Sequence, residues 1–266
     1  LKEKVLFKKG AMPSVDLEPE YIVTGADSKR AYVSLQEANS IAVLDIQNKK
    51  FTAVKGLGFK DHNIEKNAID LVKDKTINIK AQPVNGTYMP DGISIYEYKG
   101  KTYILTANEG DGREWGSYSN IGAATIDGEK VDILKNSEYD GLSADKAYTF
   151  GGRSFSIWRA DTMELVFDSG SDFETITGQQ YPQYFNASNK DVSIDSRSGK
   201  KGPEPEDIKV GMIGDQVYAF VGLERIGGVM AYNITDPSRA YYADYINTRD
   251  FSGKIAGDVS PEGLCF

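Results

Sequence analysis

The sequence predicts an all-β protein and, within that class, a β-propeller. Its 266 residues include 27 glycines, 11 phenylalanines and 16 tyrosines, a composition typical of β-strands joined by tight turns. A turn in which an acid follows a proline also recurs along the chain ahead of predicted strands. A motif that recurs at intervals of tens of residues indicates a repeat architecture. Short antiparallel strands in groups of four are the unit of a propeller.

The recurring turn is followed by a second acid at a nearly constant distance. The copies of the turn are Leu17-Glu-Pro-Glu-Tyr-Ile22, Met89-Pro-Asp-Gly-Ile93, Pro203-Glu-Pro-Glu-Asp-Ile208 and Ser260-Pro-Glu-Gly-Leu264. In the first three copies the acid after the proline and the next acid are 17 or 18 residues apart. An immunoglobulin-like sandwich also has short strands, but it gives no reason for an acid to recur at the start of each unit. The pattern therefore favours the propeller.

The first unit spans residues 17–56 and follows a lone strand predicted at Lys4–Lys8. Its four strands are predicted at 21–24, 31–35, 40–46 and 51–55, with turns rich in Asp, Asn, Ser and Lys between them. Residues 56–84 are irregular and polar, and long connections of this kind are usually functional or mobile. We predict that they form an exposed insertion.

The second unit, residues 90–136, is predicted to contain strands at 93–98, 102–107, 121–126 and 130–134. Its hairpin turns are Lys99-Gly-Lys101 and Asp127-Gly-Glu129, and Asp-Gly is a strong hairpin signal. The third unit, residues 152–170, is less regular, with strands at 154–158 and 164–168. The polar stretch 175–202 then predicts a second exposed insertion.

The fourth unit, residues 204–246, is predicted to contain strands at 207–213, 216–222, 228–234 and 241–245, and another unit starts at 260–266. We therefore predict about four blades of a roughly seven-bladed ring, within the usual range of blade numbers. The remaining blades of the same propeller, about half of the ring, are the partner that this prediction implies. The first residues carry neither the apolar run of a signal peptide nor an initiating Met, so we expect the chain to be part of something longer.

Charge and composition argue against several partners. The net charge of −8 and the sequence pI near 4.9 argue against nucleic acid, because phosphate binding needs a basic face. No segment approaches the roughly eighteen uninterrupted apolar residues of a transmembrane helix, so no membrane span is predicted. Cys265 is the single cysteine, which excludes an internal disulfide without identifying the compartment.

Several enzyme classes are disfavoured as well. His62 is the only histidine, so a zinc site with several imidazoles is excluded, and a Ser-His-Asp triad has one candidate, in a loop. The sequence has no Gly-x-Ser-x-Gly elbow, no P-loop, and no Gly-x-Gly-x-x-Gly between a strand and a helix.

In a propeller, acids at the start of each innermost strand converge on one mouth of the central channel. The acids after the second strand of each blade would add to them. Glu18, Glu37 and Glu204 belong to this pattern, and the candidate metal ligands are Glu20, Asp91, Glu109, Asp111, Glu206, Glu224 and Glu262. Calcium is the expected cation because it is hard, binds oxygen and tolerates irregular geometry, and magnesium is second. The alternative is that these acids cap turns and pair with nearby arginines.

Two arginines are candidates for binding a phosphate ester beside such a metal. Arg113 lies in Asn108-Glu-Gly-Asp-Gly-Arg-Glu114, the densest local cluster of acids and glycines, and Arg225 directly follows Glu224. Arginines beside metal-binding acids would supply bidentate contacts and neutralise charge. The alternative is an arginine–carboxylate pair that locks neighbouring blades, and for Arg225 this alternative is favoured.

The motifs of the chain resemble those of the choice-of-anchor I domain, a bacterial surface or secreted β-propeller family. That family is related to mesenchyme-specific cell-surface glycoproteins and to some atypical alkaline phosphatases. The matching segments are Asp16-Leu-Glu-Pro-Glu-Tyr21, Val33-Ser-Leu-Gln-Glu37, Gly58-Phe-Lys-Asp61, Met89-Pro-Asp-Gly92, Thr106-Ala-Asn-Glu-Gly-Asp111, Arg153-Ser-Phe-Ser156, Val166-Phe-Asp-Ser-Gly170, Lys201-Gly-Pro-Glu-Pro-Glu206, Gly222-Leu-Glu-Arg225, Gly257-Asp258 and Pro261-Glu-Gly-Leu264. They run from end to end of the chain in family order, with a small departure at Glu37-Ala-Asn39, where the family commonly has a second Asn.

The resemblance implies a propeller and an extracellular or cell-surface location. It also implies that the domain extends upstream and downstream of this chain. Two functions stay open. The first is a calcium-associated binding or structural module without catalysis. The second is a metal-dependent phosphoesterase acting on a small phosphorylated ligand, with a metal-bound water as the attacking group. The sequence favours the first.

Overall fold

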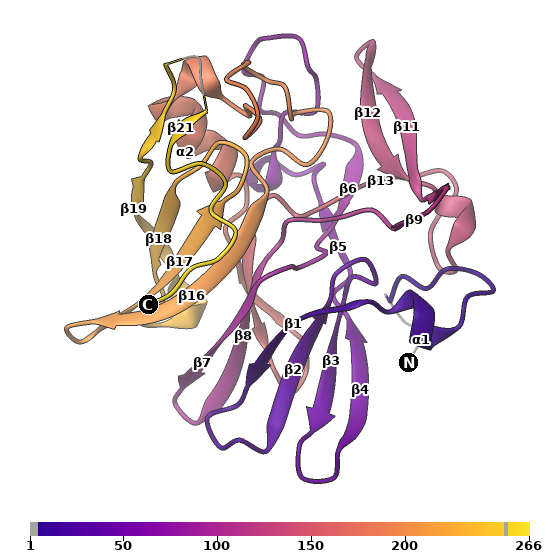
Figure 1. Cartoon of the computed structure of the whole chain (residues 1–266), viewed down its shortest axis with the longest axis vertical. Coiled ribbons are helices and arrows are strands. Elements are labelled where there is room, and N and C mark those ends of the chain that lie inside the picture. The colour runs from indigo at the N-terminus through magenta and orange to yellow at the C-terminus, as the bar shows by residue number, and fades with distance from the viewer. Residues whose placement is uncertain (1–4, 253–254) are drawn as a thin grey trace.

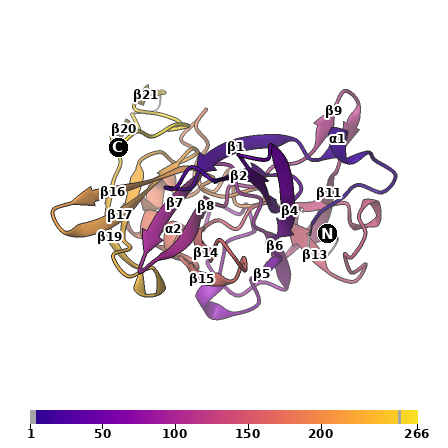
Figure 2. The same cartoon turned by 90° about the horizontal axis from the view of Figure 1, so that it is seen from below.

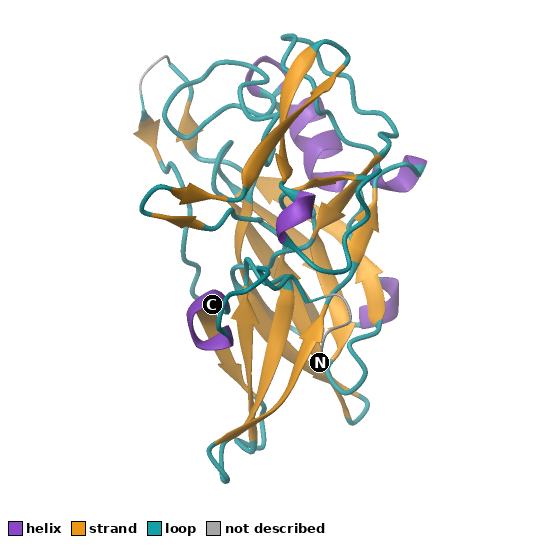
Figure 3. Ribbon diagram, turned by 90° about the vertical axis from the view of Figure 1, so that its right-hand side faces the viewer, coloured by secondary structure: helices purple, strands orange, loops and turns teal. Residues whose placement is uncertain are grey.

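The computed structural model describes residues 5–252 and 255–266, and these form the all-β protein that the sequence predicts. Strands make up most of the regular structure (Figure 3). The two α-helices, α1 (Pro13–Asp16) and α2 (Asp172–Gln180), are short. None of the helices in the described residues is long and apolar enough to cross a membrane.

The first sheet is an antiparallel meander of β1 (Pro19–Thr24), β2 (Arg30–Leu35), β3 (Ser40–Asp45) and β4 (Lys50–Gly56) (Figure 1). It confirms the four strands predicted between residues 17 and 56. The turn between β2 and β3 places Asn39 in a left-handed conformation, with φ of 50°. The Asn39 side chain donates to the carbonyl of Gly58 at 2.7 Å and accepts the N–H of Met89 at 2.9 Å. The turn is thereby tied to the next copy of the proline–acid motif.

The second sheet corrects the prediction. It has the order β15-β14-β8-β7 and consists of β7 (Ile93–Tyr98), β8 (Lys101–Ala107), β14 (Phe155–Arg159) and β15 (Leu165–Asp168). The strands assigned to a second and a third unit therefore form one sheet. β11 (Ile121–Ile126) and β12 (Glu129–Leu134) form a separate hairpin, and within the described residues neither pairs with another strand.

The residues of β14 explain why it, and not β11, pairs with β8. Phe155 and Ile157 enter one apolar core and Trp158 enters another, so β14 is buried on both faces, as an inner strand requires. β11 alternates between partly buried and exposed residues and includes Gly122. Its Asp127-Gly128 turn closes a hairpin locally, which the sequence indicates, but nothing in a local turn specifies the third strand of a sheet.

The third sheet matches the fourth predicted unit. It is a meander of β16 (Pro205–Ile213), β17 (Gln216–Leu223), β18 (Val229–Asn233) and β19 (Tyr241–Ile246). Residues 260–266, the predicted start of a further unit, form no strand and lie against β16 and β17. There the ring of Phe266 stacks on Phe220 at 5.4 Å, and the N–H of Leu264 donates to Asp207 Oδ2 at 2.8 Å.

Shorter elements fill the connections. A three-stranded sheet pairs β5 (Phe59–Asp61) with β6 (Val84–Thr87), and β6 pairs in parallel with β13 (Ala147–Thr149). The other short elements are β9 (Glu114–Trp115), β10 (Tyr118–Ser119), β20 (Arg249–Asp250), β21 (Ala256–Gly257), η1 (Glu65–Asn67), η2 (Asn136–Glu138), η3 (Pro182–Tyr184) and η4 (Pro237–Arg239). The predicted lone strand at the N-terminus begins with Lys4, outside the described residues, and Lys8 forms only an isolated bridge to Tyr139.

The two stretches predicted to be exposed insertions contain exposed segments, such as residues 73–78, and also residues that are buried against the sheets. Residues 56–84 bury Lys60, which contacts Asp168 at 2.8 Å and donates to the carbonyls of Gly152 and Gly170. Residues 175–202 follow the first turn of α2 and bury Phe185 and Asn186. The buried polar groups in these stretches bond to one another and to backbone carbonyls, as buried polar groups generally do.

The three large sheets pack side by side. One apolar core lies between the first and second sheets, around Tyr32, Ile104 and Trp158, and a larger one lies between the second and third, around Leu105, Phe155 and Tyr232. The first strand of the second sheet, β7, contacts both β1 and β16. Figure 2 shows β16 and β17 of the third sheet at the left, β7 and β8 of the second sheet next to them, and β2 and β4 of the first sheet further to the right. Among the described strands, no sheet closes into a barrel.

Candidate cation site

The four proline–acid turns share an unusual backbone conformation. In each, the residue before the proline has a positive φ: 31° at Glu18, 44° at Met89, 52° at Glu204 and 58° at Ser260. Few non-glycine residues adopt positive φ, and a following proline restricts the backbone further, so the recurrence marks one structural unit. The turns are equivalent in conformation as well as in sequence.

Strand pairing explains the constant distance between the two acids of each unit. In the first sheet Pro19 faces Leu35 across β1 and β2, and in the third sheet Pro205 faces Leu223 across β16 and β17. Both pairs are followed by the same irregularity in register. The acid after the proline and the acid after the second strand therefore lie at the same end of the hairpin.

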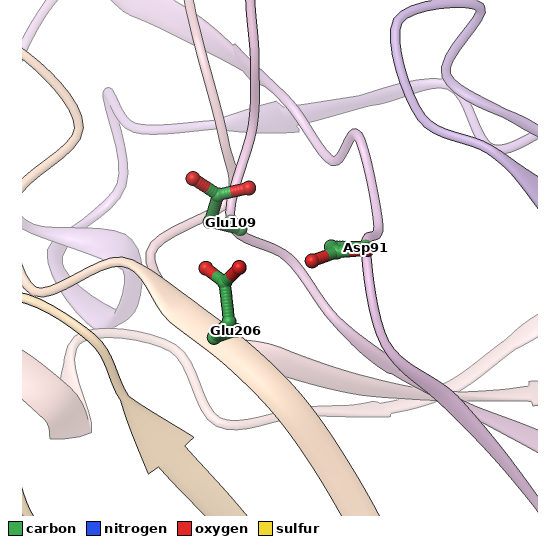
Figure 4. Close-up of side chains that lie close together, drawn as sticks. All are labelled: Asp91, Glu109 and Glu206. Carbon is green, nitrogen blue, oxygen red and sulfur yellow. The ribbon is translucent and has the colours of Figure 1, made fainter. Parts of the chain in front are cut away.

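Three carboxylates from two units meet at this end and form what we call the open acid group: Asp91, Glu109 and Glu206 (Figure 4). One oxygen of each lies within 4.8 Å of the others. Asp91 lies just before β7, Glu109 just after β8, and Glu206 at the start of β16. The Gly92 N–H donates to the Glu206 carbonyl at 2.9 Å, and the Asp91 N–H donates to the Ala107 carbonyl at 3.1 Å. The main chain fixes the convergence of these side chains.

The open acid group is short of positive charge. Within the described part of the chain, neither Asp91 nor Glu206 forms an ion pair. Glu206 Oε2 is buried and accepts no hydrogen bond. Burial, followed by the charges of Glu109 and Asp91, raises the pKa of Glu206 to about 10. Burial is also the main cause that raises the pKa of Glu109 to about 8. Without a cation, part of the group is held in the neutral form.

A second group, the filled acid group, shares Glu109 with the first and adds Glu204 and Glu224. Lys201 Nζ lies 2.5 Å from Glu109 Oε1 and 3.0 Å from Glu204 Oε2. Arg225 contacts Glu204 at 2.8 Å and Glu224 at 2.6 Å. Arg197 also pairs with Glu204. Burial raises the pKa of Glu204, but Lys201, Arg225 and Arg197 together hold it at about 2. This group carries its own counter-ions.

The remaining predicted ligands surround these groups. Asp111 Oδ1 lies 3.6 Å from Lys201 Nζ. The pKa of Glu20 is raised first by burial and then by the charge of Asp91. The charge of Glu262 contributes to raising the pKa of Glu224, after burial and the charge of Glu204. Of the seven predicted acids, the tight groups contain Asp91, Glu109, Glu206 and Glu224, and the other three lie at their edges.

The two arginines predicted to bind phosphate have other partners. Arg113 is fully buried and donates to the carbonyls of Leu6, Asp16 and Glu37 and to the hydroxyl of Tyr139. It also pairs with Asp16 Oδ1 at 3.1 Å. Arg225 is paired with two carboxylates of the filled acid group and with Asn189. Both arginines therefore fit the alternative hypothesis, in which an arginine pairs with a carboxylate and stabilises the fold.

Sequence reasoning missed two members of the site. Gln36 donates to Glu109 Oε2 at 2.6 Å, and Lys201 bonds the other oxygen of the same carboxylate. Lys201 begins the Lys-Gly-Pro-Glu-Pro-Glu motif, and it lies three residues before Glu204. A lysine so close to a run of acids indicates that it belongs to an acidic site. Its contact with Glu109, however, depends on the tertiary structure.

Comparisons with known proteins cover most of the chain. The family model of the choice-of-anchor I domain matches residues 3–237. Over 34% of its length the chain is 48% identical to Gigasin-3a of Magallana gigas. Over 66% of its length it is 26% identical to the mesenchyme-specific cell surface glycoprotein of Strongylocentrotus purpuratus. The matches cover 33% and 31% of those two proteins, so the chain spans about a third of their length.

A solved structure also aligns with the chain at low similarity. It is a chain of Kuenenia stuttgartiensis hydrazine synthase, which aligns with 93% of this chain and 71% of its own length. The two are 12% identical, with a TM-score of 0.23, which is too low to assign a shared fold.

Proposed function

We propose that this chain, which belongs to the choice-of-anchor I domain family, is an extracellular or cell-surface module that binds a divalent cation at the open acid group. The cation that we propose is calcium, with magnesium as the second choice. Binding would fix three segments from two different sheets in one position. The role that we propose for the cation is therefore structural or one of ligand binding, and not catalytic.

A single observation carries the proposal: Glu206 has a buried carboxylate oxygen without a hydrogen bond, beside two further carboxylates that face it (Figure 4). A buried acceptor without a donor costs free energy, and neighbouring carboxylates add repulsion. A divalent cation would relieve both. Calcium accepts an irregular set of six to eight oxygens, whereas magnesium requires near-octahedral geometry, and for this reason calcium is preferred.

The location outside the cell is supported by the family and by the name of one relative, a cell surface glycoprotein. The propeller is supported by the packing of three four-stranded antiparallel sheets along their first strands, which is how blades meet in that architecture. Three sheets are too few for a typical ring, so the proposal includes further sheets, from the same protein or from another chain, as structural partners.

The metal-dependent phosphoesterase that the sequence leaves open gains no support from the site. A phosphate ester would need an arginine with free donors beside the metal-binding acids. Arg113 uses its donors on backbone carbonyls and Asp16. Arg225 uses its Nη atoms on carboxylates and Asn189, and its Nε, which has no partner among the described residues, is buried.

Calcium titration with thermal unfolding tests the proposal. Because a ligand that binds only the folded state stabilises it, the unfolding midpoint should rise with calcium concentration. Glu206→Gln should remove most of that rise, since it removes one charged ligand and keeps the shape of the side chain. Glu129→Gln is the matched control, because Glu129 is an exposed acid on β12 that belongs to neither acid group. An equal calcium response in wild type and Glu206→Gln would refute the assignment of the site.

A further inference from the structure

The ammonium group of Lys201 is surrounded by oxygens in the way that a bound metal cation would be. Its Nζ is surrounded by carboxylate oxygens of Glu109, Glu204 and Asp111 at 2.5, 3.0 and 3.6 Å. The only hydrogen bond of its ammonium group within the described residues is to Glu109. These are the hard, anionic oxygens that calcium also binds. The ammonium group therefore occupies a place where three acids from two segments would otherwise repel one another.

The other buried lysine shows what a fixed structural charge looks like in this chain. Lys60 is fully buried, and besides Asp168 it donates to two backbone carbonyls, at 3.0 and 2.8 Å. A carbonyl is a neutral acceptor at a fixed position, so it holds the ammonium without depending on carboxylate charge. Lys201 has no such anchor, its side chain is 14% exposed, and it lies on a flexible four-carbon stem.

The charges around Lys201 limit how many divalent cations can enter. Six carboxylates either belong to the two groups or contact Lys201, namely Asp91, Glu109, Asp111, Glu204, Glu206 and Glu224. Three basic side chains, Lys201, Arg197 and Arg225, oppose them. With all of these groups ionised, one divalent cation leaves one net negative charge, and a second would leave one net positive charge in an otherwise acidic site. Without Lys201 the deficit grows by one charge, and two divalent cations would neutralise it.

We propose that Lys201 is a built-in counter-ion that occupies a second cation position, between Glu109 and Glu204, and so limits the site to one divalent cation. The proposal rests on the proposed function, because it presumes that the open acid group binds the first cation. Lys201 would then determine how many ions bind. With Lys201 the site takes one ion, and without it the site takes two ions, which Glu109 bridges.

Isothermal titration with calcium chloride tests this inference on the whole chain. Wild type should bind one calcium, and Lys201→Met should bind two, a doubling of the stoichiometry. Lys200→Met is the matched control, since it removes a neighbouring lysine that is exposed, and it should still bind one. Circular dichroism in the same buffers reports whether each variant is folded.

Each outcome separates the two ideas. One calcium in both wild type and Lys201→Met overturns the counter-ion role and leaves the proposed function standing. No calcium in wild type but one in Lys201→Met contradicts the assignment of the open acid group. Binding in neither contradicts both. Lys201→Met could be unfolded without metal. In that case calcium should restore its fold, because the added ion replaces the lost positive charge. If calcium does not restore the fold, the inference is overturned.

Discussion

The open acid group and the region that anchors α2 treat buried charge in opposite ways. We call the second region the α2 anchor and define it by Arg153, Glu174, Lys60 and Asp168. There, Arg153 donates to three backbone carbonyls and pairs with Glu174 at 2.6 Å. In the open acid group, Glu206 keeps a buried oxygen without a donor. Buried charges whose hydrogen-bonding groups all have partners indicate a structural role. A buried carboxylate oxygen without a donor indicates a place where a ligand can bind.

Both carboxylates of the α2 anchor also accept further hydrogen bonds. Besides Arg153, Glu174 accepts the N–H of Asp70 at 2.7 Å and the side-chain amide of Asn186 at 2.9 Å. Asp168 accepts the hydroxyls of Ser154 and Ser156. The predicted insertions are therefore held to the second sheet by charges that have no capacity left for a ligand.

The largest effect should come from breaking the α2 anchor. Arg153→Met leaves Glu174 buried with a charge that has lost its partner, and it deprives three carbonyls of their donor. We expect a loss of about 3 to 5 kcal/mol in the free energy of unfolding, measured by urea denaturation. Arg239→Met, at an exposed position in η4, should change it by less than about 0.5 kcal/mol. Similar effects for both variants would show that the α2 anchor is not needed for stability.

The next effect should come from His62, which is buried beside Lys60. Burial, and then the charge of Lys60, lowers the pKa of His62 to about 3 in the folded protein. Unfolded histidine takes up a proton below about pH 6.5, while the folded protein does not, so stability is lost as pH falls from about 6.5 towards 3. We expect this titration of His62 to lower the free energy of unfolding by about 2 kcal/mol between pH 7 and pH 5.

The measurement is the difference in unfolding free energy between wild type and His62→Gln at each pH. Taking the difference removes the contribution of other titrating groups, including Asp70, whose pKa burial raises to about 6. The advantage of wild type over the variant should shrink as the pH falls. A difference that stays constant from pH 7 to pH 5 would contradict a neutral buried imidazole.

The smallest effect has the opposite sign and belongs to the open acid group. In calcium-free buffer Glu206→Gln should stabilise the protein by about 1 kcal/mol, because a neutral amide replaces a carboxyl group that must take up a proton to be buried there. Urea denaturation in the presence of a chelator measures this. Glu129→Gln is again the control and should have no effect beyond error. Destabilisation by Glu206→Gln would mean that the carboxylate is already matched, as in the α2 anchor.

The recurring motif is where sequence reasoning reached furthest. It located the proline–acid turns, and the structure gives all four the same left-handed residue before the proline. It also selected Asp91, Glu109 and Glu206, which the structure brings within 4.8 Å of one another. Local spacing sufficed here, because a two-stranded hairpin of fixed register returns its ends to the same place.

Sequence reasoning failed where the decisive contact spans a long stretch of chain. It paired β8 with β11, yet β8 pairs with β14, whose residues lie some fifty positions further along. It also treated the polar segments 56–84 and 175–202 as wholly exposed, although Lys60 and Phe185 within them are buried. Periodicity reports which faces of a strand are apolar, but it does not report which distant segment covers them.

The sequence by itself determined the all-β class, the strands of the first and third sheets, and the family of the chain. These depend on short-range patterns: alternation, turn residues and a repeated motif. Only the tertiary structure decided which acids already have counter-ions. Lys201 reaches Glu109 across 92 residues of sequence, and Gln36 reaches it across 73. Charge balance at a site is a sum over neighbours in space, so it cannot be read from neighbours in sequence.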